Sequence, residues 1–348
     1  IISLVKSMPT IVKTFSKAVK GFGHKDTTEL RTNKDLPLPV VMGGALVIAL
    51  VIWLLPSVPV SLIGALIIVV FGFFFATVSS RMVGLVGSSN NPVSGMAIAT
   101  LLIATAMLKA TGMTGYEGMA SAICIGTVIC IVAAMAGDTS QDLKTGYIVG
   151  ATPIRQQIGE LVGALVSALA IGGVMYLLNA AWGFGEQQLP APQATLMKLV
   201  VEGVMGGTLP WGLVFCGIFI AVVIEVLGLP VLPIAIGLYL PIYLSVPIFI
   251  GGMIRWFFEW NKAGKSKEEN KDVIDRGILY SSGLIAGEGL IGILLAVFAV
   301  IPLKGGSTLA DLIKLETPLG NAGGVVFFLL LLATIFYFSL HRKKKREA

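Results

Sequence analysis

Long apolar runs, separated by short polar stretches, dominate the chain. Each approaches or exceeds the roughly 20 residues that a helix needs to cross a bilayer. They do not alternate between apolar and polar residues as the strands of a membrane barrel do. The pattern predicts an all-α polytopic membrane protein with about 8–10 transmembrane helices, some of them re-entrant or broken. The single spans are predicted at about 39–55, 60–79, 92–110, 117–136, 155–182, 211–227, 277–301 and 322–340.

Two further segments complete this arrangement. Residues 183–210 are expected outside the cytoplasm, with an interfacial helix over 196–204, where apolar residues follow helical spacing. Residues 230–258 are long enough for one helix, but a single crossing would carry the lysine-rich stretch 261–276 to the outside. That would violate the positive-inside rule. We therefore expect a hairpin of two helices that breaks near Pro241.

An internal repeat supports the hairpin. Residues 91–99 resemble residues 229–237, and residues 159–163 resemble residues 287–292 if one insertion is allowed. Two spans separate the paired motifs in the first copy. The second copy should therefore also contain two helical elements between its motifs.

The composition agrees with this class and adds an orientation. The chain is 55% hydrophobic, with a mean hydropathy of +0.90, and its net charge is +6. The positive charge gathers at the ends and in one loop, which indicates membrane orientation and not nucleic-acid binding. We expect a cytoplasmic basic segment or linker at 1–37, a transmembrane domain at 38–341 and a cytoplasmic basic tail at 342–348. Both ends would then face the cytoplasm in a multi-pass protein of the cell (cytoplasmic or inner) membrane.

A dense polar stretch interrupts the apolar runs between Gly137 and Tyr147, and Arg155, Gln156 and Glu160 continue it into the next helix. One interpretation is a solvated loop between membrane helices. The other is a functional site, because an ionisable group inside a span is costly. Gln156 and Glu160 are four residues apart, so they share one helix face.

A second irregular stretch contains Asn90, Asn91 and Pro92. An ordinary cytoplasmic loop is one interpretation. We favour a re-entrant or broken helix that begins inside the protein, because irregular backbone at membrane depth must be buried or line water. Asn91 would cap this helix and Pro92 would occupy its first turn.

Two carboxylates inside predicted spans are candidates for proton exchange. Glu288 lies near the middle of 277–301, among glycines, and is the first candidate; Glu160 is the second. Desolvation favours the neutral form of a carboxyl group, which allows such a group to exchange protons. In the alternative, neighbouring helices simply satisfy Glu288, and Arg155 pairs with Glu160.

Other residues are candidates for a substrate path or its gate: Asn90, Asn91, Asp138, Gln141, Asp142, Arg155, Gln156, Tyr239 and Tyr243. The aspartates could instead be loop anchors, and the tyrosines could be packing residues. No histidine or cysteine ligand set and no nucleophile–base arrangement is evident. We therefore expect no metal site, no cofactor and no enzymatic activity.

Three stretches carry a family resemblance: residues 89–92, residues 137–157 and residues 283–289. In this order they resemble signature stretches of the oligopeptide transporter family, which includes the yellow-stripe-like metal-chelate carriers. The resemblance covers most of residues 35–340. Members of that family are roughly twice as long, so we expect this chain to be the carboxyl-terminal half of a longer member.

The resemblance implies a secondary active transporter of the plasma membrane, with proton-coupled symport of oligopeptides or peptide-like metal chelates. Its partners would be a small peptide or metal chelate, protons, membrane lipid and the missing amino-terminal half, but no nucleic acid. The residues alone indicate only a secondary transporter, from the repeat, the broken helices and the carboxylates inside the membrane. An ion-coupled carrier of another small solute and an intramembrane enzyme are the alternatives.

Overall fold

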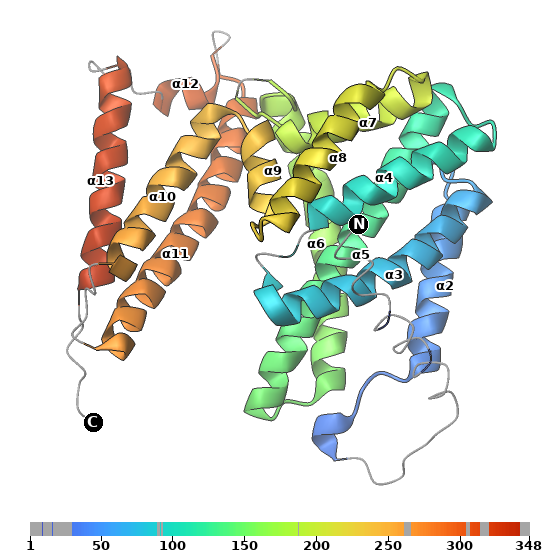
Figure 1. Cartoon of the computed structure of the whole chain (residues 1–348), viewed down its shortest axis with the longest axis horizontal. Helices are drawn as coiled ribbons and strands as arrows, with labels where there is room; N and C mark the ends of the chain where they lie inside the picture. The colour runs from blue at the N-terminus through green and yellow to red at the C-terminus, as the bar shows by residue number, and fades with distance from the viewer. Residues whose placement is uncertain are drawn as a thin grey trace. The chain divides into compact units, whose positions relative to one another are not determined.

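The computed structural model shows a helical chain, whose elements are labelled in Figure 1. It describes residues 9, 16, 30–88, 91, 93–186, 188–260, 266–303, 307–313 and 320–341, without the side chains of Leu85, Val86, Leu232, Tyr239 and Asn321. The chain divides into two compact units. The first comprises Ile1–Ala168 and Gln193–Pro233, and the second comprises Leu169–Pro192 and Ile234–Ala348.

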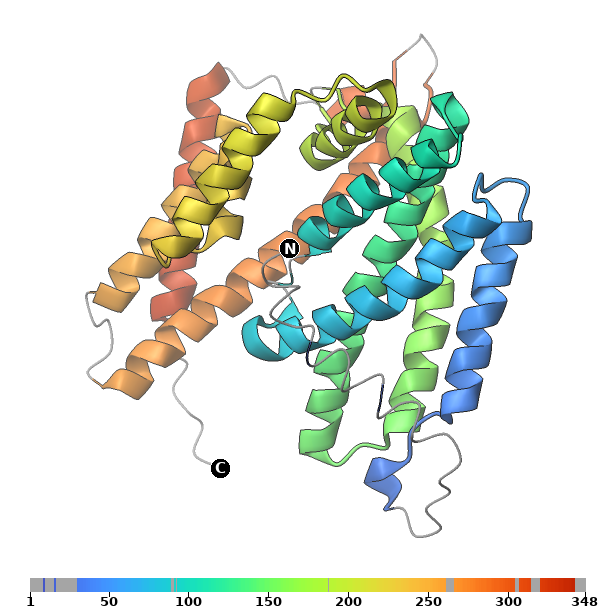
Figure 2. The same ribbon diagram turned by 45° about the vertical axis from the view of Figure 1, so that its right-hand side comes forward.

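The first unit contains a 3-10 turn, six helices and the first part of α6, which ends in the second unit. In chain order these are η1 (Arg31–Asn33), α2 (Leu38–Leu54), α3 (Leu62–Val86), α4 (Val93–Ala110), α5 (Gly115–Val149), α6 (Pro153–Ala181), α7 (Pro192–Gly206) and α8 (Trp211–Val226). Within this unit, α3 and α4 both pack along α5 (Figure 2). The core therefore lies among three helices that are consecutive in the sequence.

Large side chains from these three helices fill that core. Phe75 of α3, Leu108 of α4, and Ile125 and Ile129 of α5 are almost completely buried, and Val201 of α7 joins the same cluster. Small buried residues lie between them and let the helix backbones approach closely, as is usual in membrane bundles.

Gly126 marks one such close approach, between α5 and α4. A Cβ atom at residue 126 would lie 2.6 Å from Leu101 Cδ2. Gly126→Val is therefore expected to overpack this contact and to destabilise the fold by about 1–3 kcal/mol. A lower midpoint of thermal unfolding in detergent would show the effect. Gly43→Val on α2 is the control, because a Cβ atom there meets nothing within 4 Å; equal midpoints would contradict the prediction.

The second unit contains the greater part of α9 (Val231–Tyr239), with α10 (Ile242–Trp260), α11 (Lys267–Val300), α12 (Leu309–Ile313) and α13 (Gly320–Leu340). Aromatic contacts hold it together. The ring centroids of Phe258 on α10 and Phe336 on α13 lie 5.1 Å apart. Tyr280 on α11 stacks on Phe338 on α13, with ring centroids 4.5 Å apart.

The predicted fold class is confirmed. Among the described residues, eight helices are long and apolar enough to cross a membrane. The helix expected at 196–204 is part of α7. The expected break in 230–258 is also present, because α9 ends at Tyr239 and α10 begins at Ile242.

Three predicted boundaries are wrong. The helix expected to end near residue 79 is α3, which continues to Val86. The polar stretch 137–149 is not a loop, because α5 continues unbroken to Val149. Residues 267–276, expected as loop, form the first turns of α11. The Ser266 hydroxyl caps that helix by accepting from the main-chain N of Glu269 at 3.2 Å. Hydropathy marks the part of a helix that suits lipid, whereas caps and turn residues decide where the helix ends.

Candidate functional site

The polar stretch forms the carboxyl-terminal part of α5. This helix has 35 residues, which is about 52 Å at 1.5 Å per residue and exceeds a hydrocarbon core of about 30 Å. Its polar end thus continues beyond the apolar part. Gly150, in the left-handed conformation at φ 73°, ends the helix. Pro153 then starts α6, and the two helices lie side by side next to this turn in both views (Figures 1 and 2).

Gln156 and Glu160 lie on one face of α6, as their spacing predicted, and the structure places this face against α5. Gln156 Nε2 donates to the main-chain oxygen of Asp142 at 3.2 Å. Thr139 Oγ1 donates to Glu160 Oε2 at 2.7 Å. The buried Gly146 allows this approach, because a Cβ atom at that position would overlap the Gln156 amide. Two side-chain hydrogen bonds therefore connect the polar end of α5 to the start of α6.

One oxygen of each of these two side chains is buried and unsatisfied. Within the described part of the chain, neither Glu160 Oε1 nor Gln156 Oε1 accepts a hydrogen bond. Both residues line an open cleft of about 390 Å³, together with Asp142, Thr145 and Gly159. A buried polar group without its partner costs about 1–3 kcal/mol. Two acceptors without a donor among the described residues are therefore buried beside this cleft.

A second polar cluster lies between α3 and α5. Ser79 Oγ donates to the main-chain oxygen of Ala133, and Asn91 Nδ2 donates to Ser79 Oγ at 2.6 Å. Gly137 is buried beside them; a Cβ atom there would lie 2.7 Å from Asn91 Nδ2. Asn91 is therefore half-buried just before α4. Its Oδ1 accepts no hydrogen bond from the described residues, so the expected helix cap is not seen. The other two residues of this stretch, Asn90 and Pro92, are outside the described part of the chain.

Three more candidate residues lie at this end of α5 and α6. Gln141 Oε1 accepts from the main-chain N of Ser88 at 2.8 Å, which ties α5 to the segment before α4. Asp138 and Arg155 are exposed. The ion pairs of the described residues do not include Arg155 with Glu160, so the alternative of a neutralising partner for Glu160 is not seen.

The remaining candidates belong to the second unit. Tyr243 on α10 and Glu288 on α11 are exposed, and the Tyr239 side chain lies outside the described residues. Glu288 is about two-thirds of the way along α11, not near its middle, because the helix begins at Lys267. A Cβ atom would meet nothing within 4 Å at any of the four glycines around it, at positions 283, 287, 289 and 292. Within the second unit, the described residues leave this part of α11 open, and the role of Glu288 stays a prediction.

Comparison with known proteins decides the family. The chain matches the family described as OPT oligopeptide transporter protein over residues 1–299. It belongs to the oligopeptide transporter family. It is 33% identical over 281 residues to a Haemophilus influenzae protein named "Putative oligopeptide transporter". This alignment covers 71% of this chain and 44% of that protein. A rice protein (Oryza sativa subsp. japonica) named "Probable metal-nicotianamine transporter YSL11" is 24% identical over 328 residues, covering 87% of this chain and 44% of that protein.

The match therefore spans less than half the length of either relative. Both relatives are named as transporters, not as enzymes. No solved structure matches the chain. Family membership and the apolar helices together show a multi-pass membrane protein of a transporter family.

The order of the helices agrees with the predicted internal repeat, but the two glutamates lie at different positions along their helices. In each copy two helices precede the one that carries the glutamate: α4 and α5 precede α6, and α9 and α10 precede α11. Glu160 lies about a quarter of the way along α6, whereas Glu288 lies about two-thirds of the way along α11. The two carboxylates are thus not equivalent along their helices.

A strap formed by residues 31–36 crosses the turn between α5 and α6, and no sequence pattern indicated it. The Arg31 guanidinium donates to Thr152 Oγ1 at 2.8 Å. The main-chain N of Leu36 donates to Gln157 Oε1 at 2.9 Å. Each bond joins residues 121 positions apart in the chain. The strap therefore fixes the turn that brings Glu160 and Gln156 against α5.

Removing the Arg31 side chain should loosen this turn. Arg31→Met loses the bonds to Thr152 Oγ1 and to the Gly150 main-chain oxygen. We expect faster amide hydrogen exchange over residues 150–157, by about fivefold if exposed charged hydrogen bonds contribute about 1 kcal/mol. Lys34→Met is the control: it removes the same charge, but Lys34 contacts Ile154 through its main-chain oxygen. Equal exchange in both variants would mean that Arg31 does not hold the turn.

Proposed function

We propose that this chain forms part of a proton-coupled symporter of oligopeptides or peptide-like metal chelates, in which Glu160 takes up and releases the coupled proton. The observation that carries the proposal is the pair of buried, unsatisfied oxygens, Glu160 Oε1 and Gln156 Oε1, beside one cleft. The names of the two relatives support the two substrate classes. Glu288 is kept as a second proton-coupling candidate.

A proton on Glu160 would complete the hydrogen bonding of the cleft. An ionised carboxylate only accepts, whereas a protonated carboxyl group also donates through one O–H. Oε2 can continue to accept from Thr139, while a proton on Oε1 gives the Gln156 oxygen on the same helix face a potential donor. Protonation thus turns Glu160 Oε1 from an unsatisfied acceptor into a donor, while Gln156 Oε1 remains an acceptor. It also removes the cost of a charge taken partly out of water.

Such a change can bias the contact between α5 and α6. The neutral carboxyl group favours the closed contact, whereas the charged one favours hydration and a wider cleft. A ligand, here the proton, shifts a conformational equilibrium by as much as its affinity differs between the two states. This difference would allow a proton gradient to drive alternating access, with the strap and the Gly150 turn limiting the movement.

We also propose that the basic ends of the chain face the cytoplasm of a cell membrane. The support is the density of lysine and arginine in 1–37, 261–276 and 342–348. Most of the first segment, and all of the last one, lie outside the described residues. The substrate, protons, membrane lipid and an amino-terminal half supplied by a longer protein are the proposed partners.

Uptake by the full-length protein in proteoliposomes tests the proposed function. A pH-sensitive dye is trapped inside, and the outside is acidified. A tripeptide or an iron chelate should then enter against its gradient and acidify the interior. Entry that follows a sodium gradient without acidification would instead indicate an ion-coupled carrier of another kind. If the interior acidifies equally with and without the tripeptide, and equally with and without the iron chelate, the proposal is overturned.

A further inference from the structure

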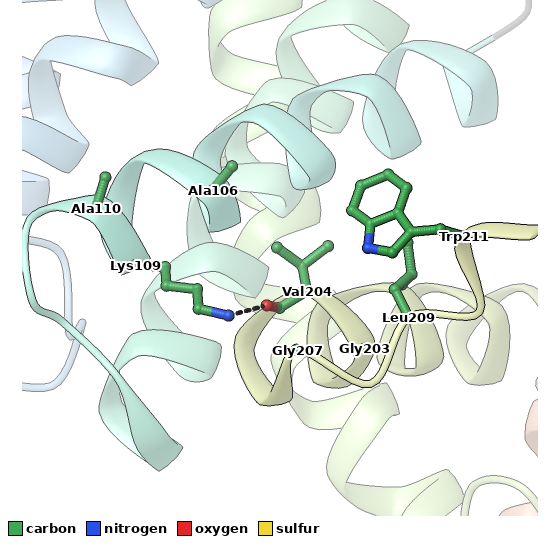
Figure 3. A pocket seen from close by; sticks show the side chains of 8 residues that line it. All are labelled: Ala106, Lys109, Ala110, Gly203, Val204, Gly207, Leu209 and Trp211. Carbon is green, nitrogen blue, oxygen red and sulfur yellow. Dashed lines mark hydrogen bonds between the residues drawn. The ribbon is translucent and has the colours of Figure 1, made fainter.

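A cavity of about 400 Å³ lies in the first unit where α4, α7 and the start of α8 meet (Figure 3). Its lining is largely apolar and includes Ala106, Ala110, Leu209 and Trp211. Among the described residues that line it, Lys109 carries the only charge. The proposed proton chemistry uses none of these residues.

The ammonium group of Lys109 is held in place but not neutralised. Its Nζ donates to the main-chain oxygen of Val204 at 2.8 Å, in the last turn of α7, where the carbonyl ends of a helix favour a cation. An ammonium has three donors, and this bond uses one. The ion pairs of the described residues do not include Lys109; Glu202 on the same α7 pairs with Lys198 at 3.8 Å. The cavity therefore presents a fixed cation with donors to spare.

We propose that this cavity binds the headgroup of an anionic phospholipid. The lipid phosphate accepts from the free N–H groups of Lys109, and the adjoining methylene groups lie along Ala106, Ala110 and Leu209. Trp211 is 57% exposed at the start of α8, and an indole ring of this kind favours the headgroup level of a bilayer. The inference needs only the membrane class of the chain and does not depend on proton coupling.

The lining favours an amphiphile over a small free anion. A free phosphate or a substrate carboxylate would gain one charged contact while leaving apolar walls in contact with water. A phospholipid places its phosphate on the lysine and buries methylene groups against those walls, which adds a hydrophobic contribution.

Lipid binding to the full-length protein, measured by native mass spectrometry, tests the site. Phosphatidylglycerol should bind more tightly than phosphatidylcholine. Lys109→Met should weaken phosphatidylglycerol binding by about fivefold, the loss expected when a hydrogen bond that contributes about 1 kcal/mol is removed. Lys109→Arg should retain the binding. Lys198→Met, which removes a lysine of α7 outside the cavity, should bind as the unchanged protein does.

A second variant guards against a folding effect of the lysine substitution. Ala106→Leu narrows the cavity without touching the bond from Lys109 to Val204, and it should weaken phosphatidylglycerol binding as well. Unchanged phosphatidylglycerol binding in both Lys109→Met and Ala106→Leu would overturn the proposal. Displacement of the lipid by inorganic phosphate or by a tripeptide at millimolar concentration would also overturn it, because the cavity would then be a site for a free anion or for a substrate carboxylate.

Discussion

Replacing Glu160 by glutamine is expected to abolish substrate accumulation under a proton gradient while leaving exchange at equal pH partly intact. Glutamine keeps an oxygen that can accept from Thr139 Oγ1, a bond that measures 2.7 Å. Its amide also carries N–H donors, in place of the O–H of the protonated carboxyl group. The variant therefore resembles the protonated state but cannot release a proton, so the cycle can exchange substrate without coupling to the gradient. Uptake into proteoliposomes with and without a pH difference separates the two activities.

Two controls sharpen the Glu160 experiment. Glu202→Gln makes the same change on α7, at an exposed residue that pairs with Lys198, and should transport normally. Thr139→Val removes the donor to Glu160 Oε2 while leaving the carboxyl group, and should retain accumulation under a proton gradient. Accumulation by Glu160→Gln at the unchanged rate would show that another group carries the coupled proton.

The helices were predictable because each apolar run had to become a helix in lipid, where an unsatisfied backbone group is expensive. Their ends were less predictable. α5 continues through 137–149 because this stretch contains no proline and no residue in a left-handed conformation. Gly150, which follows it, takes that conformation and ends the helix. Hydropathy falls at Gly137, but helix formation does not require lipid. The same reasoning applies to α11, whose first turns from Lys267 are charged but capped by Ser266.

Part of the candidate site followed from local spacing. Because Gln156 and Glu160 are four residues apart, their shared helix face could be predicted, and the structure turns this face toward α5. The partners on the other side could not be predicted. Thr139 is an ordinary small polar residue in the sequence, and only the turn at Gly150 places it opposite Glu160. The strap depends on contacts between residues far apart in the chain, such as Arg31 and Thr152.

Glu288 poses a different problem, because its surroundings are open within the described structure. An ionised carboxylate facing lipid well inside a span is costly. The glycines at 283, 287, 289 and 292 leave space for a close neighbour or for water along this part of α11. Helices approach one another closely at small residues, so this part of α11 suits protein contact or a water-filled path better than lipid contact.

Glu288→Leu is therefore expected to abolish substrate-dependent flux in both modes, accumulation and exchange, while the protein remains folded in detergent. Leucine removes the charge and fills the space beside the glycines with an apolar side chain. If this part of α11 met lipid, removing the charge would instead stabilise the protein, by about 2.5–3.5 kcal/mol on insertion scales, and flux would persist. Glu268→Leu in the polar first turn of α11 is the matched control. A raised unfolding midpoint together with normal flux in Glu288→Leu would remove Glu288 from the transport path and leave Glu160 as the remaining carboxylate candidate.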